Sequence, residues 1–211
     1  MIKILIADDH PIVLNGLKQI LSDESSTMKV TGEASNAREI FKLLEKNEYD
    51  ILILDIGLPD INGMEVLTML RKSNPKLKVL VLSGLPEEQY AMRAVKSGAL
   101  GFMHKETAPE ELVDAIRTVI SGRKYLSSSF KEKTLMDIIE NKDSPLHKYL
   151  SEREFEIFCM LGSGMTVSEI GEKLYLSIST VSTYRSRVLQ KMGMKNNAEI
   201  MKYCVKENLS I

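Results

Sequence analysis

The chain has 211 residues, of which 44% are hydrophobic and 27% charged, and its formal net charge is −1 at pH 7. This composition is typical of a globular protein with one or two cores and argues against a disordered or fibrous chain. No apolar stretch reaches the roughly 18 residues of a membrane span, no signal segment opens the chain, and Cys159 and Cys204 lack partners at metal-ligand spacing. We therefore expect a cytoplasmic protein with reduced thiols and no membrane association.

Up to Gly122 the chain alternates short apolar runs with stretches of helical period. The runs are rich in Ile, Val and Leu, as strands buried on both faces are. We predict strands over Lys3–Ala7, Val30–Ala34, Ile51–Leu54, Val79–Ser83 and Gly101–His104. We predict helices over Ile12–Leu21, Asn36–Asn47, Gly63–Ser73, Glu87–Ser97 and Pro109–Ser121. Five such repeats predict a flavodoxin-like, doubly wound, five-stranded parallel sheet over residues 1–122, and strand order 2-1-3-4-5 would place the first, third and fourth strands side by side.

The pattern changes after Gly122. Residues 123–147 contain a serine triplet, mixed charges and one predicted short helix at about Phe130–Glu140, and we interpret them as a linker. Residues 148–211 have helical period throughout and predict a small all-α domain of four helices. These helices are expected over Glu152–Ser163, Val167–Leu174, Ser179–Met192 and Asn197–Glu207. From Lys173 onward seven basic residues face two acidic ones, so the last part of the chain is basic although the whole is not.

Polar side chains gather where the predicted strands end. Asp8 and Asp9 follow the first strand, Asp55 follows the third, Ser83 ends the fourth and Lys105 follows the fifth. Because functional groups of parallel sheets collect at the carboxyl ends of the strands, we expect one pocket. Adjacent carboxylates repel each other unless water or a cation offsets the repulsion, so a solvated strand end with a helix cap is the alternative interpretation. A site whose ligands are carboxylate oxygens, with coordination positions left for water, suits Mg²⁺ or Mn²⁺.

The motifs "ADDH", "LDIGLPDINGMEVL", "VLSG" and "GFMHK" follow one another over residues 1–122. Together they resemble the receiver domain of two-component response regulators. The resemblance implies that Asp55 accepts a phosphoryl group from a cognate histidine kinase. It also implies that Asp9 binds the metal directly, Asp8 through water and Gly57 through its main-chain carbonyl. Gly57 replaces the usual bulky residue, which loosens the backbone there.

The same resemblance assigns residues around the phosphoryl group. Lys105 would pair with its oxygens and the Ser83 hydroxyl would bond another oxygen. Phe102 is expected to be a core aromatic residue in either case, and it is also a candidate switch residue. Taken alone, Lys105 also fits a solvated lysine at a strand end, and Asp55 a capping or surface carboxylate. A carboxylate that attacks a phosphoryl group needs a metal, because both groups are anions.

The helices Val167–Leu174 and Ser179–Met192, joined by a short turn, have the helix-turn-helix plan. The second helix carries a basic, hydroxyl-rich stripe, and Val181, Val188 and Met192 form its apolar stripe. Such a polar face suits the major groove of double-stranded DNA, although a solvated helix face is the alternative. The residues predicted to contact DNA are Thr180, Ser182, Thr183, Arg185, Ser186, Arg187 and Lys191, with Arg187 and Lys191 at the backbone and Thr183 and Ser186 nearer the bases.

The stretches "LSEREFEIFCMLGSGMT", "EIGEKLYLSISTV" and "VLQKMGM" resemble the LuxR-type DNA-binding domain of the NarL/FixJ group of response regulators over residues 148–211. Where that group most often has Thr-Val-Lys followed by His, this chain has Thr180-Val181-Ser182 and then Tyr184. A common contacting lysine is therefore missing, and Arg185 and Arg187 could compensate for it. The resemblance implies homodimers, formed through receiver helices, the terminal helix, or both.

Together, the receiver and the DNA-binding domain predict a transcription regulator whose receiver is phosphorylated on Asp55 and whose response is dimerisation and DNA binding. We do not expect the protein to be an enzyme. Two alternatives come from other classes. A phosphatase with an Asp nucleophile would need an acid two residues further on, where this chain has Gly57. A DNA-binding regulator that acts independently of phosphorylation would use the receiver only as an interaction module.

Overall fold

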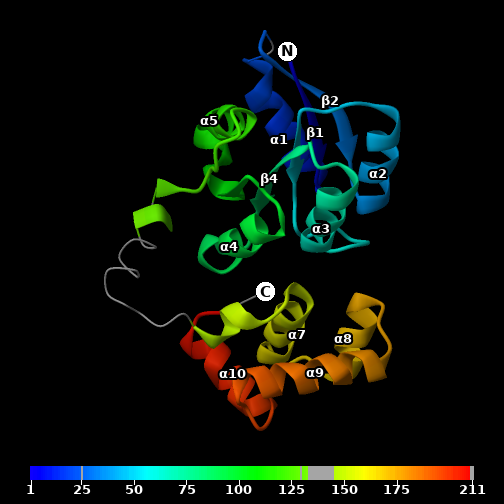
Figure 1. Cartoon of the computed structure of the whole chain (residues 1–211), viewed down its shortest axis with the longest axis vertical. Coiled ribbons are helices and arrows are strands. Elements are labelled where there is room, and N and C mark those ends of the chain that lie inside the picture. Colours follow the sequence, from blue (N-terminus) through cyan, green and yellow to red (C-terminus); the bar gives the residue numbers. More distant parts are fainter. Residues whose placement is uncertain (25, 129, 133–144, 210–211) are drawn as a thin grey trace. The chain divides into compact units, whose positions relative to one another are not determined.

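One parallel sheet forms the centre of the first of two units in this chain. The computed structural model describes residues 1–24, 26–128, 130–132 and 145–209, and the units are Met1–Asp137 and Ile138–Ile211. The strand order is β2-β1-β3-β4-β5 and every pair is parallel, which confirms the predicted topology (Figure 1). The strands are β1 (Ile2–Ala7), β2 (Met28–Ala34), β3 (Ile51–Leu54), β4 (Lys78–Ser83) and β5 (Gly101–His104).

Helices cover both faces of this sheet. Each predicted helix is present, with ends that differ by one residue at most from the sequence prediction. The helices α1 and α5 share one apolar cluster with Ile4, Ile53 and Leu80 of the strands, whereas α3 and α4 pack against each other. The helices are α1 (Pro11–Ser22), α2 (Ala37–Lys46), α3 (Gly63–Ser73), α4 (Glu87–Ser97) and α5 (Ala108–Ile120).

The second unit is helical, as predicted. A short 3₁₀ helix, η2 (Leu146–Tyr149), precedes α7, which packs against both α9 and α10, while α8 packs against α9. Serine, threonine or asparagine caps the N-terminus of each of the four α-helices that the described residues of this unit form, which satisfies main-chain N–H groups that the helices leave unpaired. The α-helices are α7 (Glu152–Gly162), α8 (Val167–Leu174), α9 (Ile178–Met192) and α10 (Asn197–Lys206).

The turn between α8 and α9 is tight. Tyr175, at the end of α8, has φ of 53° in the left-handed region, and Ser177 caps α9. A Cβ atom on Gly171 would lie 2.9 Å from the carbonyl oxygen of Leu176, so the close approach requires glycine. None of the helices among the described residues is long and apolar enough to span a membrane.

Both ends of the predicted linker are structured. Tyr125 pairs with Gly101 at the edge of β5, so the first unit extends beyond residue 122, where composition placed its end. At the other end, His147 of η2 is buried, and its Nδ1 lies 3.1 Å from the hydroxyl of Tyr203. The helix predicted at about Phe130–Glu140 lies mostly outside the described residues. In this part of the chain, the structure describes residues 128 and 130–132, and they are helical.

An ion pair between an exposed lysine and a buried glutamate joins the last turn of α9 to the first turn of α7. The Lys191 ammonium lies 2.6 Å from Glu154 Oε2, and Glu154 is 4% exposed. Burial alone would raise the pKa of Glu154, but hydrogen bonds from Lys191 and Ser151 outweigh it and lower the pKa below its usual value. Glu154 therefore stays ionised in the folded state and depends on Lys191 for its partner.

We predict that Lys191→Ala destabilises the second unit by about 1–3 kcal/mol, because it leaves a buried carboxylate without its cation. Since folding lowers the pKa of Glu154, the contribution is complete above the unfolded pKa of about 4.3 and is lost as pH falls through the folded pKa. Hydrogen exchange of α7 and α9 peptides in urea measures this stability separately from that of the first unit. Lys202→Ala, at an exposed lysine of α10, should change nothing. Equal destabilisation by Lys191→Ala in a Glu154→Gln background would contradict the assignment.

Candidate functional site

The carboxyl ends of the central strands bring two aspartates together. Asp8 and Asp55 follow β1 and β3, which are neighbours in the sheet. The Asp8 N–H donates to the Ala34 carbonyl over 3.0 Å and the Asp55 N–H to the Ala7 carbonyl over 2.9 Å, so the strand hydrogen bonding continues through both residues. Both side chains are almost fully buried. The ends of the strands therefore hold two carboxylates in a fixed place with little contact with water.

Lys105 connects these carboxylates. Its Nζ lies 2.7 Å from Asp8 Oδ2 and 2.8 Å from Asp55 Oδ2. Burial alone would lower the pKa of Lys105, but its contacts with Asp55 and Asp8 raise the pKa above the usual value. Lys105 is therefore protonated and offsets the repulsion between the two aspartates. The sequence placed all three groups in one pocket but did not predict that Lys105 contacts Asp8.

A metal-capable cluster lies beside Lys105. One ligand atom from each of Asp8, Asp9, His10 and Asp55 lies within 4.8 Å of the other three. Asp8 Oδ2 and Asp9 Oδ1 are buried, and among the described residues neither accepts a well-directed hydrogen bond, although each has a cationic or imidazole nitrogen nearby. Buried carboxylate oxygens in this state fit a hard divalent cation. The carboxylate oxygens of this cluster are therefore suitable ligands for a divalent cation such as Mg²⁺.

His10 is a residue of this cluster that sequence reasoning did not single out. Its Nδ1 lies 2.7 Å from Asp9 Oδ1 and 3.1 Å from Asp8 Oδ1. The signal was its position next to Asp9 in "ADDH", at the start of α1. The imidazole occupies the solvent side of the two aspartates, since its side chain is 64% exposed.

Hydrogen bonds to the start of α2 hold the loop that follows β3. Asp60 accepts hydrogen bonds from the N–H groups of Ala37 (2.8 Å) and Arg38 (3.1 Å) at the start of α2. Burial would raise the pKa of Asp60, but these main-chain hydrogen bonds lower it, so Asp60 stays charged. Within the loop, a Cβ atom on Gly57 would point at Asp55 Oδ2 from 3.4 Å. Glycine at position 57 therefore leaves one side of the Asp55 carboxylate open.

Ser83 and Phe102 lie on the strands at the other side of the pocket. Ser83 ends β4 opposite His104 of β5, is 1% exposed, and its hydroxyl oxygen accepts from the Leu85 N–H over 3.2 Å. Phe102 is fully buried, and its main-chain N–H donates to the carbonyl of Tyr125 over 3.2 Å. The structure thus places Ser83 at the same edge of the sheet as Asp55, and shows Phe102 as a core aromatic residue.

The outer face of α9 carries the second predicted site. Val181, Val188 and Met192 are buried, so the predicted apolar stripe faces the core of the second unit. The Arg187 guanidinium lies 5.9 Å from the centre of the Tyr184 ring. The opposite face is polar and exposed over Thr180, Ser182, Thr183, Ser186 and Arg187.

Two predicted DNA contacts have partners within the second unit. Arg185 Nε donates to Asn197 Oδ1 over 2.7 Å, and Lys191 pairs with Glu154. Both side chains are thus tied to other helices, which sequence spacing could not reveal. Arg187, by contrast, has no ion pair among the described residues. It is therefore the cation of α9 that is best placed to meet an external anion.

Comparison with known proteins matches both units to families. The family described as "Response regulator receiver domain" matches residues 4–117, and that described as "Bacterial regulatory proteins, luxR family" matches residues 148–204. The chain is 34% identical over 211 residues to response regulator UvrY of Escherichia coli (strain K12), covering 99% of this chain and 96% of that protein. It is 33% identical to response regulator GacA of Pseudomonas aeruginosa, with 99% and 98% covered.

A solved structure gives the same result. It shows RcsB from Salmonella enterica serovar Typhimurium bound to promoter rprA in the presence of the phosphomimetic BeF3⁻, with a TM-score of 0.71 and 25% identity over 96% of this chain and 97% of that chain. The parallel sheet with its acidic edge and the four helices with their helix-turn-helix agree with these matches. The chain therefore belongs to the response regulators of the NarL/FixJ type, in which a receiver domain precedes a LuxR-type DNA-binding domain.

Proposed function

We propose that this response regulator accepts a phosphoryl group on Asp55 from a histidine kinase and, in response, controls transcription by binding double-stranded DNA. The observation that carries the proposal is the buried Asp55 carboxylate, which contacts Lys105 and is itself part of the metal-capable cluster. A regulator that binds DNA regardless of phosphorylation has no need for this arrangement. Because DNA is its target, we place the protein in the cytoplasm.

In the transfer, an Asp55 carboxylate oxygen attacks phosphorus, a new O–P bond forms, and the N–P bond to the kinase histidine breaks. The leaving imidazole keeps the bonding electron pair and takes up a proton. The Lys105 ammonium, now 2.8 Å from Asp55 Oδ2, then pairs with the phosphoryl oxygens, and the Ser83 hydroxyl donates to another. A bound Mg²⁺ or Mn²⁺, held by Asp55, by Asp9, by Asp8 through water and by the Gly57 carbonyl, would neutralise charge on the transferred group.

We propose no turnover of external phosphoesters. A phosphatase with an Asp nucleophile needs a general acid near the leaving group, and position 57 carries no side chain. Incubation with a generic aryl phosphate checks this point: we expect no product beyond one equivalent per chain. Sustained release of the phenol would indicate an enzyme.

In the second unit, we propose that the exposed face of α9 enters the major groove. The hydroxyl groups of Thr180, Ser182, Thr183 and Ser186 would face the bases, and Arg187 a phosphate. Thr183 and Ser186 also donate to main-chain carbonyls one turn earlier, over 2.9 and 3.0 Å, which leaves the lone pairs of their oxygens for base donors. We propose that phosphorylation favours a homodimer, in which the two copies of α9 would occupy the two halves of a two-fold DNA site.

The first prediction for this function concerns the phosphoacceptor. Asp55→Asn is nearly isosteric but cannot form an acyl phosphate. After incubation with acetyl phosphate and Mg²⁺, intact mass measurement should show one added phosphoryl group on the unmodified protein and none on Asp55→Asn. Asp23→Asn, at an exposed aspartate after α1, should be labelled like the unmodified protein. Labelling of Asp55→Asn to the same extent would show that another residue is the acceptor.

The metal prediction concerns Asp9, which is the carboxylate of the cluster that Lys105 does not contact. Asp9→Ala should leave the first unit at least as stable without metal, because it removes a charge that repels Asp8. With Mg²⁺ at about 100 times Kd, the unmodified protein should gain roughly 2.7 kcal/mol, and Asp9→Ala much less. Thermal unfolding with and without Mg²⁺ measures both quantities, with Asp23→Ala as control. If Asp9→Ala gains as much from Mg²⁺ as the unmodified protein, the ion is bound elsewhere.

The DNA prediction separates backbone from base contacts on α9. Arg187→Ala should weaken binding to all duplexes about equally and flatten the dependence of log K on log salt by roughly one unit, whereas Arg187→Lys should keep the slope. Thr183→Val should change the preference between sites by roughly 1–3 kcal/mol, and Thr183→Ser should restore it.

Titration of a selected and a scrambled duplex at several salt concentrations measures these effects. An Arg187→Ala effect confined to one sequence would assign Arg187 to base recognition. We use Arg187 here because Lys191→Ala also removes the partner of Glu154, so that a loss of DNA binding would mix two causes.

A further inference from the structure

The chain that leaves α5 returns to the open edge of the sheet. We call residues 125–128 the strap. The Tyr125 N–H donates to the Leu100 carbonyl over 2.9 Å, and the Phe102 N–H donates to the Tyr125 carbonyl over 3.2 Å. A Cβ atom on Gly101 would lie 3.0 Å from both Cβ and the carbonyl oxygen of Tyr125, so the two chains are in close contact. The strap therefore satisfies main-chain groups of β5 that an edge strand would leave exposed.

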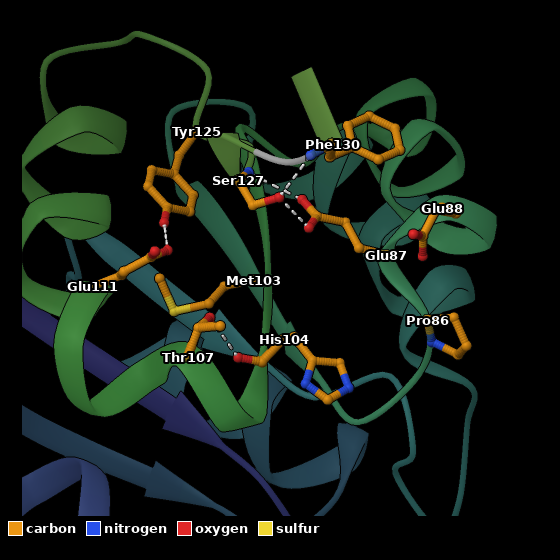
Figure 2. A pocket seen from close by; sticks show the side chains of 10 residues that line it. All are labelled: Pro86, Glu87, Glu88, Met103, His104, Thr107, Glu111, Tyr125, Ser127 and Phe130. Atoms are coloured by element: carbon orange, nitrogen blue, oxygen red, sulfur yellow. Dashed lines mark hydrogen bonds between the residues drawn. The ribbon is translucent and has the colours of Figure 1, made fainter. Parts of the chain in front are cut away.

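A second anchor holds the strap to α4. The Ser127 N–H donates to Glu87 Oε1 over 3.0 Å, and the Ser127 hydroxyl donates to Glu87 Oε2 (Figure 2). The same hydroxyl oxygen accepts from the Phe130 N–H over 3.1 Å and so begins the helical turn that follows. Glu87 is the first residue of α4. One serine thus joins the strap to the N-terminus of that helix.

Between its anchors the strap crosses a hollow. The Tyr125 hydroxyl donates to Glu111 of α5, on the far side of a pocket of about 360 Å³ whose floor includes Met103 and Thr107 (Figure 2). Polar contacts hold the strap at Tyr125 and Ser127, and the Tyr125 side chain also packs against the apolar cluster of the first unit. None of residues 125–128 is fully buried, and segments with few buried residues open locally at a lower free-energy cost than the core of the fold.

Both anchors lie close along the chain to residues of the proposed phosphorylation pocket. Glu87 follows Ser83 by four residues along the chain, and Tyr125 bonds to the main chain of Phe102, three residues before Lys105. The His104 imidazole lies 3.2 Å from the Gly84 carbonyl and connects the two segments. A shift of Ser83 and Lys105 toward a phosphoryl group would therefore displace the groups that hold the strap.

We infer that the strap is a phosphorylation-sensitive contact: it is docked on β5 and α4 when Asp55 is free, and it is released when Asp55 carries a phosphoryl group. The inference rests on the proposed function. Coupling of this kind is reciprocal, so weakening the strap favours the phosphorylated conformation to the same extent that phosphorylation weakens the strap.

Hydrogen–deuterium exchange of the full chain, with and without Mg²⁺ and BeF3⁻, tests the inference. In the unmodified protein, BeF3⁻ should protect the peptide that contains Asp55 and should speed exchange of the peptide covering residues 123–131 by about tenfold. Ser127→Ala should exchange fast at 123–131 without BeF3⁻, and it should need several-fold less BeF3⁻ for half-maximal protection at Asp55. Ser128→Ala, at an exposed neighbour, is the matched control and should behave like the unmodified protein.

The outcomes separate the two proposals. Absence of protection at Asp55 would overturn the proposed phosphoacceptor, and the strap inference with it. Protection at Asp55 with unchanged exchange at 123–131 would overturn the strap inference alone. So would a Ser127→Ala variant with the exchange rates and BeF3⁻ requirement of the unmodified protein.

Discussion

The contact of the Lys105 ammonium with both Asp8 and Asp55 is the interaction on which the acidic edge of the sheet depends. Two carboxylates that lie against each other with little water would repel by several kcal/mol at the effective dielectric of a protein surface. Lys105, which directly follows β5, offsets that repulsion, so the residues after β1, β3 and β5 are electrostatically linked. The ion pairs also hold Lys105 close to the oxygen that is proposed to react. A change in charge at Asp55 would therefore act first on Lys105.

Sequence reasoning succeeded where local chemistry decides the structure. Continuous apolar runs such as Ile51–Leu54 identify buried parallel strands, and a parallel sheet brings the residues after its strands to one edge. That rule predicts that Asp8, Asp55 and Lys105 share one pocket. Caps such as Asn36, whose side chain accepts from the Glu39 N–H, explain why helix ends were accurate to a residue.

Contacts between side chains that are far apart in the chain could not be predicted from the sequence. Lys191 and Glu154 are 37 residues apart, and their pairing depends on how α9 crosses α7. From the helical stripe alone, Lys191 had every feature of a phosphate contact. The strap was missed for another reason: its serine-rich sequence is typical of a linker, and only the free edge of β5 gives Tyr125 a main-chain partner. In both cases the contact depends on how distant segments pack together, which local sequence pattern does not specify.

Docking of the strap also bears on how copies of this chain could associate. An edge strand with unpaired main-chain groups is a template to which a strand of another chain can add. At β5, the Tyr125 N–H and carbonyl already pair with the Leu100 carbonyl and the Phe102 N–H. Strand-to-strand association of two copies at this edge would therefore first have to displace Tyr125.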